Sequence, residues 1–436
     1  MYNTTRHIIK WLCLSALLCA SVSCSKEMDA PDTPDVPSGE EMTLHIGFKV
    51  PTRAAAEGYE DGETDENYID IADGNYRIYF FDENNKFIAR FEPSGFIVTE
   101  GSNYCHYSVL GKAPDALVEH RDFFKMVVLA NWPSYPEDLN EEKEENLPLM
   151  EESTTIEEIC TADWAQYDCL LDNQTTPPTA IALDPFAADP DERKLMPFYG
   201  VHEYEDITFT PGQATILEEP VTLLRAMAKV EVILEIEDNE FADDLSFSSV
   251  VINRYNKRGY CAPKGVYRKE DYDHDGDGDE KLEQDYVHEL HLVGDANDAT
   301  AKNLSCRRVG EWKELDGKRY KKWTAYLPEY QNVDVENAYS SIQAKFNIQL
   351  ADDTHTIHFA TYGGDGKTDN GNDHRLNIER NNIYRFRVTC TGYNYSLRLT
   401  VSDWEGLYEN IFDFGETQIV SPVSPWDDEK DNEIIF

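Results

Sequence analysis

The stretch Asp271 to Glu280 holds the residue types best suited to binding a metal ion. Aspartates stand at alternate positions, and Gly276 allows a sharp turn at the sixth position. Carboxylates spaced in this way can surround one Ca²⁺, as in the first nine positions of an EF-hand-type loop. Leu282 occupies the twelfth position, where a glutamate is usual, and Glu283 or Asp285 could replace it. The candidate ligands are Asp271, Asp273, Asp275, Asp277 and Asp279. The alternative is a solvated acidic loop between strands.

Cys24 is a candidate for covalent lipid attachment. Arg6 and an apolar run from Ile8 to Ala20 precede it, and a polar, proline-containing stretch follows. This order is typical of a secretory signal, residues 1–23, that ends at a lipoprotein cysteine carrying palmitate. The apolar run is about 13 residues long, shorter than the roughly 20 that a membrane-spanning helix needs. The alternative is an ordinary cysteine beside a conventional cleavage site.

The bond between Arg53 and Ala54 is a candidate site of proteolysis. It follows a single alternating strand pattern, Thr43 to Val50, and Pro51 interrupts that pattern. Cleavage here would separate residues 24–53, the tether and the first strand, from the rest of the chain. The alternative is that Arg53 is only a basic residue in a loop.

Charge excludes several classes of function. The chain has 436 residues, of which 84 are acidic and 39 basic, and its net charge is −45. Such a surface repels the phosphates of nucleic acids and anionic lipid headgroups. The lipid anchor is therefore the one membrane contact that we expect. No nucleophile elbow and no HExxH zinc motif occurs, and we expect no enzymatic activity.

The spacing of the cysteines does not decide whether they form disulfides or stay as free thiols. Outside the signal and Cys24, six cysteines remain at wide and irregular intervals. An exported chain can form disulfides, and Cys160 and Cys169 are close enough in sequence to pair. The alternative is a set of buried free thiols.

Short strand patterns dominate the rest of the chain. A hairpin is predicted from Tyr76–Phe81 and Lys86–Phe91, and one helix from Thr155 to Ala165. Further predicted strands include 124–131, 207–209, 214–217, the second half of 221–236, and 286–292. The acidic stretch 57–73 is expected to be a flexible loop. This pattern predicts an all-β chain with two tandem β-sandwich domains, residues 54–220 and 221–436. The second contains the acidic loop 270–285 and a C-terminal tail.

The order of these features resembles the type V fimbrial subunits (fimbrillins) of Bacteroidota, the FimA-like pilins. The resemblance covers most of the chain after the signal. It rests on the lipoprotein signal, Thr52-Arg53-Ala54, Phe80-Phe81-Asp82, Val127 to Asn131, Met196 to Gly200, Leu224 to Val230, Glu379 to Arg385 and Val401 to Trp404.

The resemblance implies two transthyretin-like β-sandwich domains in a lipoprotein exported to the outer membrane. It also implies cleavage after Arg53, which would bare unpaired backbone groups for a strand from another subunit. The donor is expected at the C-terminus, where Thr417 to Val423 and Glu433 to Phe436 are apolar in part. Pro422 and Pro425 weaken this tail as a strand, so stalk, tip and unpolymerised roles remain open.

Two functions from different classes follow. The first is a structural and adhesive fimbrial subunit assembled by donor-strand exchange. Its partners would be other fimbrial subunits, an arginine-specific protease and a host or bacterial surface ligand. The second is a monomeric, surface-tethered glycan-binding lipoprotein, for which exposed Trp or Tyr platforms would be expected.

Overall fold

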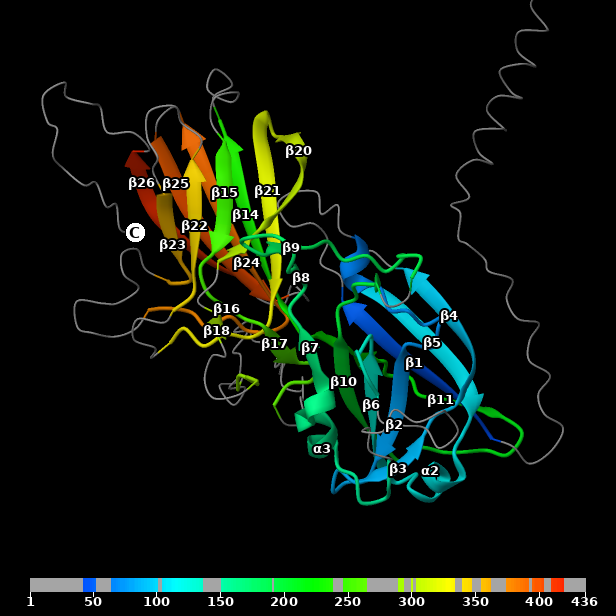
Figure 1. Ribbon diagram of the computed structural model, residues 1–436. Coiled ribbons are helices and arrows are strands. Elements are labelled where there is room, and N and C mark those ends of the chain that lie inside the picture. The colour runs from blue at the N-terminus through cyan, green and yellow to red at the C-terminus, as the bar shows by residue number, and fades with distance from the viewer. Residues whose placement is uncertain are drawn as a thin grey trace, which may run out of the picture.

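The computed structural model of the chain describes residues 42–51, 64–100, 104–135, 150–189, 192–237, 246–264, 289–293, 299–300, 303–333, 339–346, 354–361, 374–391, 394–403 and 409–418. Strands dominate these residues, with two short α-helices, α2 (Asp115–Glu119) and α3 (Ile156–Thr161). Neither helix has the length and apolar character needed to cross a bilayer. The strands form two bodies of stacked sheets, here named the first and second units (Figure 1). The predicted all-β, β-sandwich class is confirmed.

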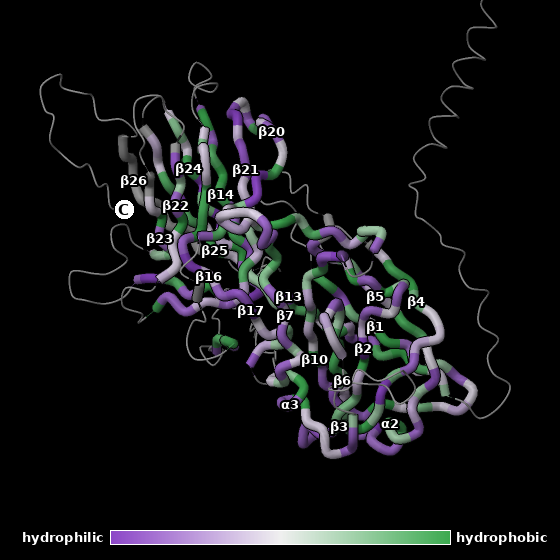
Figure 2. The backbone as a smooth tube through the Cα atoms, viewed as in Figure 1, coloured by the Kyte–Doolittle hydropathy of each residue, from purple (hydrophilic) through white to green (hydrophobic). Residues whose placement is uncertain are grey.

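The first unit is a sandwich of two sheets. One sheet has the order β11 (Ala214–Ile216), β1 (Thr43–Pro51), β5 (Tyr104–Lys112) and β4 (Pro93–Glu100), and β12 (Val221–Thr222) also pairs with β1. The other sheet has the order β13 (Leu224–Arg225), β10 (Phe198–Glu205), β6 (Phe123–Ala130), β2 (Tyr76–Phe81) and β3 (Phe87–Arg90). Figure 2 shows that apolar residues are concentrated in these strands, while the turns between them are hydrophilic.

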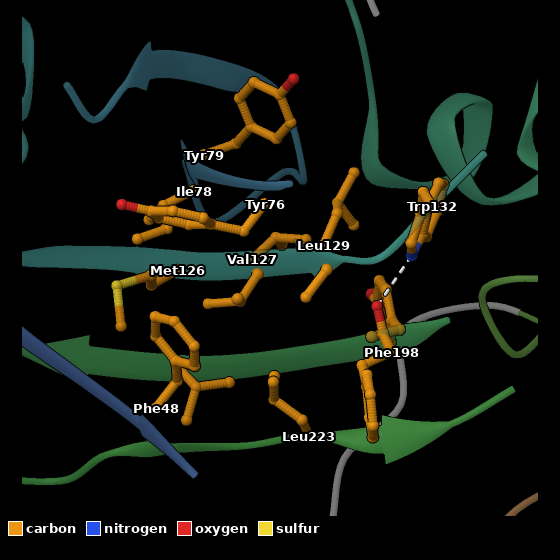
Figure 3. Close-up of a cluster of buried hydrophobic side chains, with 14 of the residues drawn as sticks. Phe48, Tyr76, Ile78, Tyr79, Met126, Val127, Leu129, Trp132, Phe198 and Leu223 are labelled. Carbon is orange, nitrogen blue, oxygen red and sulfur yellow. Dashed lines mark hydrogen bonds between the residues drawn. The ribbon is translucent and has the colours of Figure 1, made fainter. Parts of the chain in front are cut away.

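Side chains from both sheets make one core. Phe48 of β1 lies in the same cluster as Met126 and Val127 of β6, as Figure 3 shows. At one end of the cluster, Trp132 Nε1 donates a 2.7 Å hydrogen bond to the carbonyl of Phe198. This bond satisfies the polar atom of a buried indole and fixes the end of β6 against β10.

Two local predictions are confirmed. β2 and β3 pair as a hairpin, and Asn85 in the turn has a positive φ of 61°. Asp82 Oδ1 accepts hydrogen bonds from the backbone amides of the turn, which is the usual role of Asp there. Thr155 and Glu158 form the predicted capping box of α3. The helix ends at Thr161, before a 3-10 turn, η3 (Asp163–Ala165), and is therefore shorter than predicted.

Three sequence predictions differ from the structure. Residues 207–209 are not a strand, because the amide of Ile207 bonds instead to the carbonyl of Arg121 in a neighbouring loop. Residues 289–292 are also not a strand, since the amide of His291 bonds to the carboxylate of Glu329. Stretch 57–73 contains a 3-10 turn, η2 (Thr64–Asn67), followed by the buried Ile69.

The second unit also consists of two sheets. The larger has the order β20 (Arg307–Leu315), β21 (Lys318–Leu327), β14 (Ala228–Ile236), β24 (Asn382–Thr391), β25 (Asn394–Asp403) and β26 (Glu409–Gln418). The other has the order β23 (Thr354–His358), β22 (Ser341–Phe346), β15 (Phe247–Ile252), β19 (Leu304–Ser305), β9 (Thr179–Ala180) and β8 (Leu171–Asp172). Val230, Val232 and Leu234 of β14 are fully buried in its core.

A segment early in the chain crosses between the units. β8 and β9 pair within the second unit, and β7 (Gln166–Asp168) pairs with β17 (Arg258–Tyr260). Figure 1 shows β7 between the two bodies and α3 beside the first unit. The two units are therefore interleaved in sequence near residue 170, and the domain boundary at 220/221 stays a prediction.

Candidate functional site

Several predicted site residues lie outside the described part of the chain. They are Cys24, Arg53, Ala54 and the acidic loop residues Asp271, Asp273, Asp275, Asp277 and Asp279. Among the described residues, no group of three or more His, Cys, Asp or Glu side chains is arranged to hold a metal ion. β1 is the described strand next to the predicted cleavage site, and it is therefore the part of the structure that bears on the functional hypothesis.

β1 is an interior strand of its sheet. It pairs antiparallel with β5 along its whole length, from Thr43 opposite Lys112 to Pro51 opposite Tyr104. On its other side it pairs in parallel with β11 and β12, two short strands that share this edge between them. We name the position that β1 occupies between β5 and these two strands the β1 slot.

One face of β1 is completely buried. Leu44, Ile46, Phe48 and Val50 alternate along the strand, and each is 0% exposed. Burial of one such side chain contributes roughly 1.5–3 kcal/mol, so the four together are a large share of a domain's net stability. Phe48 also stacks on Tyr107 of β5, with ring centroids 5.2 Å apart. An empty β1 slot would expose this apolar surface to water.

Backbone hydrogen bonds hold both edges of β1. Directly after β11 and directly after β12, the amides of Leu217 and Leu223 donate to the carbonyls of His45 and Lys49, at 3.0 and 2.8 Å. Without β1, those amides and the facing groups of β5 would lose their partners. An unpaired edge of this kind is a template for another strand.

The outward face of β1 is basic. His45 and Lys49 alternate with Gly47 on this face, and Lys49 stands opposite His106 of β5. Burial lowers the pKa of His106, and the nearby His45 and Lys49 lower it further.

The chain that follows β1 is anchored independently of it. Glu66 of η2 is buried, and its Oε1 lies 2.5 Å from Lys229 Nζ of β14. Tyr326 of β21 also donates its hydroxyl hydrogen to Glu66. Just after Glu66 in the sequence, Asn67 and Ile69 are also held. The Tyr107 hydroxyl accepts a hydrogen bond from the Ile69 amide and donates one to the Asn67 carbonyl. A cut between β1 and η2 would leave the downstream chain tied to both units.

Lys229 belongs to a larger charge network inside the second unit. Glu231 Oε1 lies 2.9 Å from Lys229 Nζ and 3.5 Å from Lys322 Nζ, and Glu231 Oε2 lies 2.6 Å from Arg385 Nε. Burial opposes ionisation of Glu231, but the three cations hold its pKa well below its usual range. We name Glu66, Lys229, Glu231, Lys322 and Arg385 the charge network. The sequence patterns did not predict this network. The feature that could have indicated it was the alternation of two charged residues, Lys229 and Glu231, in a buried strand.

The predicted C-terminal donor begins inside the fold. Thr417 and Gln418 belong to β26, which pairs with β25 at the edge of the larger sheet of the second unit. Residues 419–436 lie outside the described part of the chain. Only that later part of the predicted donor could leave this subunit without dismantling β26.

The described cysteines are free thiols. Cys160 and Cys169 are both buried, and burial raises the pKa of each thiol well above its ordinary value. Of the two alternatives, buried free thiols describe these residues, and their raised pKa values make them poor nucleophiles.

The described tryptophans do not form exposed platforms. Trp132 and Trp323 are buried, and Trp164 and Trp312 are half-buried. Trp312 is covered by two cations, with Arg319 Cζ 5.0 Å and Lys321 Nζ 4.6 Å from its ring. Trp164 packs against Trp132, with ring centroids 6.1 Å apart.

No protein-family model and no curated protein matches the chain. Solved structures similar to it include a fimbrial assembly protein from Parabacteroides distasonis ATCC 8503, at 13% identity and a TM-score of 0.40, covering 86% of this chain and 100% of that one. They also include the fimbrial anchor protein Mfa2 from Porphyromonas gingivalis, at 9% identity and a TM-score of 0.29, covering 83% of this chain and 98% of that one.

Proposed function

We propose that this chain is a structural and adhesive subunit of a cell-surface fimbrium. It is exported as a lipoprotein through Cys24, cut after Arg53, and joined to other subunits by donor-strand exchange. The observation that carries the proposal is the place of β1. It is an interior strand with a fully buried apolar face, and it immediately precedes the predicted cleavage site.

The energetics of β1 support exchange rather than simple loss. Removing β1 would uncover four apolar pockets and two rows of backbone groups, a state that is costly in water. An incoming strand with the same alternation would restore both kinds of contact. Because η2 is anchored by Glu66 and Tyr107, the rest of the first unit has a fixed attachment while the strand is replaced.

The N-terminus of the protein tests this proposal. It should be measured by mass spectrometry in intact cells and in material sheared from the cell surface. An N-terminus at Ala54 in sheared, high-molecular-weight material is expected. Lipidated Cys24 in all the material would contradict cleavage-driven assembly and favour the tethered glycan-binding lipoprotein.

Two substitutions make the test specific. Arg53→Lys keeps the charge but removes the arginine-specific site, and it should leave the protein lipidated and absent from sheared polymer. Cys24→Ser should remove the lipid without altering the β1 slot. If Arg53→Lys protein still appears in sheared polymer with β1 attached, strand removal is not required for assembly.

A further inference from the structure

Gly47 lies at the centre of β1 for reasons of space. A Cβ built on it would lie 2.8 Å from Nε2 of His106 and 3.2 Å from Cβ of Pro220. Its φ is outside the left-handed region, so its backbone conformation does not require glycine. Glycine inside a strand weakens the strand and often marks close approach of another group.

Both groups that confine Gly47 belong to the β1 slot rather than to β1. His106 is on β5, and Pro220 lies between β11 and β12. Because both lie outside β1, a strand that enters the slot in place of β1 would meet the same restriction. The His106 ring can rotate to admit a methyl group, whereas the ring of Pro220 cannot turn away from a larger side chain.

The inward face sets a second requirement. Phe48 follows Gly47 and stacks on Tyr107, with an interplanar angle of 12°. Leu44, Ile46 and Val50 fill the remaining buried positions. The slot therefore fits a strand with apolar residues at alternate positions, glycine at the central outward position, and an aromatic residue directly after the glycine.

The C-terminal part of this chain does not meet these requirements. Residues 419–436 contain no glycine, and Pro422 and Pro425 lack the amides that a central strand must donate. The last glycine of the chain is Gly415 in β26. Aligning it with Gly47 would put the carboxylate of Glu416 in the pocket of Phe48, where burial of a charge is costly.

We propose that the β1 slot selects its donor strand through the space left at Gly47, and that it accepts a Gly-aromatic strand from a different subunit rather than the C-terminus of a second copy of this chain. This inference rests on the proposed function, because it names the partner of the same slot. Its predicted consequence is a chain that joins other subunits but does not polymerise with itself.

Peptide exchange into the full-length chain tests the selection. The purified chain is cut after Arg53 with an arginine-specific protease, and fluorescent peptides with the sequence of residues 43–51 are added. The Gly47→Ala peptide should bind about 10-fold more weakly than the native peptide, and the Gly47→Val peptide about 100-fold more weakly, since overpacking has costs of this order. A Thr43→Ala peptide, changed on the same outward face but opposite Lys112 rather than His106, serves as the matched control and should bind within about 3-fold.

A substitution in the slot, rather than in the peptide, separates the effect of limited space at Gly47 from a change in the peptide's own tendency to form a strand. In His106→Ala protein the Gly47→Ala peptide should regain native-like affinity, whereas the Gly47→Val peptide should stay weak because Pro220 remains. A peptide of residues 415–436 should not compete with the native peptide in either protein. Equal binding of the glycine, alanine and valine peptides, or competition by the 415–436 peptide, would overturn the selection while leaving donor-strand exchange intact.

Failure of the proposed function has a different signature. If the native peptide itself does not exchange into the cut chain, the slot does not accept strands, and both the function and the selection are wrong. In the uncut chain, Gly47→Ala should lower the melting temperature, and adding His106→Ala should recover part of the loss. The recovery of melting temperature in the double variant measures the restriction at Gly47 without any strand exchange.

Discussion

β1 in the first unit and β14 in the second both have an antiparallel neighbour on one side and parallel neighbours on the other. Both bury an apolar face. They differ on the opposite face. Lys229 and Glu231 of β14 join the charge network with β21, β24 and η2, whereas among the described residues no side chain of β1 forms an ion pair. β14 is held by ion pairs that depend on specific partners, and β1 by apolar packing and backbone pairing, the two kinds of contact that the proposed exchange requires of an incoming strand.

The largest effect is expected from breaking the charge network. Glu231→Gln leaves three buried cations, Lys229, Lys322 and Arg385. Of the carboxylates of the charge network, only that of Glu66 would remain to balance them. Removing one partner of a buried ion pair costs about 3–5 kcal/mol. Guanidinium unfolding should show this loss, and hydrogen exchange should increase first in β14, β21 and β24. Glu237→Gln is the matched control, because Glu237 is partly exposed and such pairs contribute only about 0–1 kcal/mol.

A somewhat smaller effect is expected from a cavity under β1. Ile46→Ala removes a fully buried side chain from β1 and should cost roughly 2–4 kcal/mol. Hydrogen exchange should increase in β5 and β11, while β14 stays protected. Ile97→Ala on β4, which pairs with β5 in the same sheet, removes a side chain that is 61% exposed and should change stability by less than about 0.5 kcal/mol. Increased exchange in β14 after Ile46→Ala would contradict the independence of the two strands.

Tyr107→Phe tests the attachment of η2 and Ile69 to β5. It keeps the ring that stacks on Phe48 but removes the hydroxyl that bonds to Ile69 and Asn67. Loss of these buried hydrogen bonds should cost about 1–3 kcal/mol. Faster proteolysis within residues 64–72 is expected. Tyr104→Phe, on the same strand but half exposed, should have no measurable effect.

Acid should weaken the β1 region modestly. The pKa of His106 is lowered in the folded chain, so below the unfolded value of about 6.5 the unfolded state binds more protons. Stability therefore falls as the pH decreases below that value and is preserved above it. Melting temperatures measured between pH 8 and pH 5 should decline less in His106→Gln protein. The exposed His120→Gln variant should follow the wild type, and a wild-type slope in His106→Gln would contradict this account.

Sequence patterns predicted elements whose partners are close in the chain. The β2–β3 hairpin and the Thr155 capping box depend on residues a few positions apart, and both are confirmed. β5 was missed because Tyr104 and Leu110 face outward and Gly111 faces inward, which hides the alternation. β20 was missed because it is a largely solvated edge strand with mixed charges.

The candidate site was only partly predictable. The apolar alternation of residues 43–50 predicted β1 and its buried face, and the structure confirms both. Its interior position depends on β11 and β12, which lie more than a hundred residues away. Residues 214–217 were predicted as a strand, but the sequence does not show that this strand pairs with β1. Glu66 was expected in a solvated loop, because its partner Lys229 is distant in sequence. The space at Gly47 is set by His106 and Pro220 together, and only the folded chain brings them there.

In a fimbrium of the kind proposed above, tension would reach each subunit through its exchanged strands and spread into the fold. If the two units were joined only by a flexible linker, the linker would extend first. Segment 166–180 prevents this, since Gln166–Asp168 pairs with β17 and Thr179 pairs with Ser305 in the second unit. The Cys169 amide in this segment also donates a 2.7 Å hydrogen bond to the Lys257 carbonyl. The subunit should therefore resist stretching as one mechanical element.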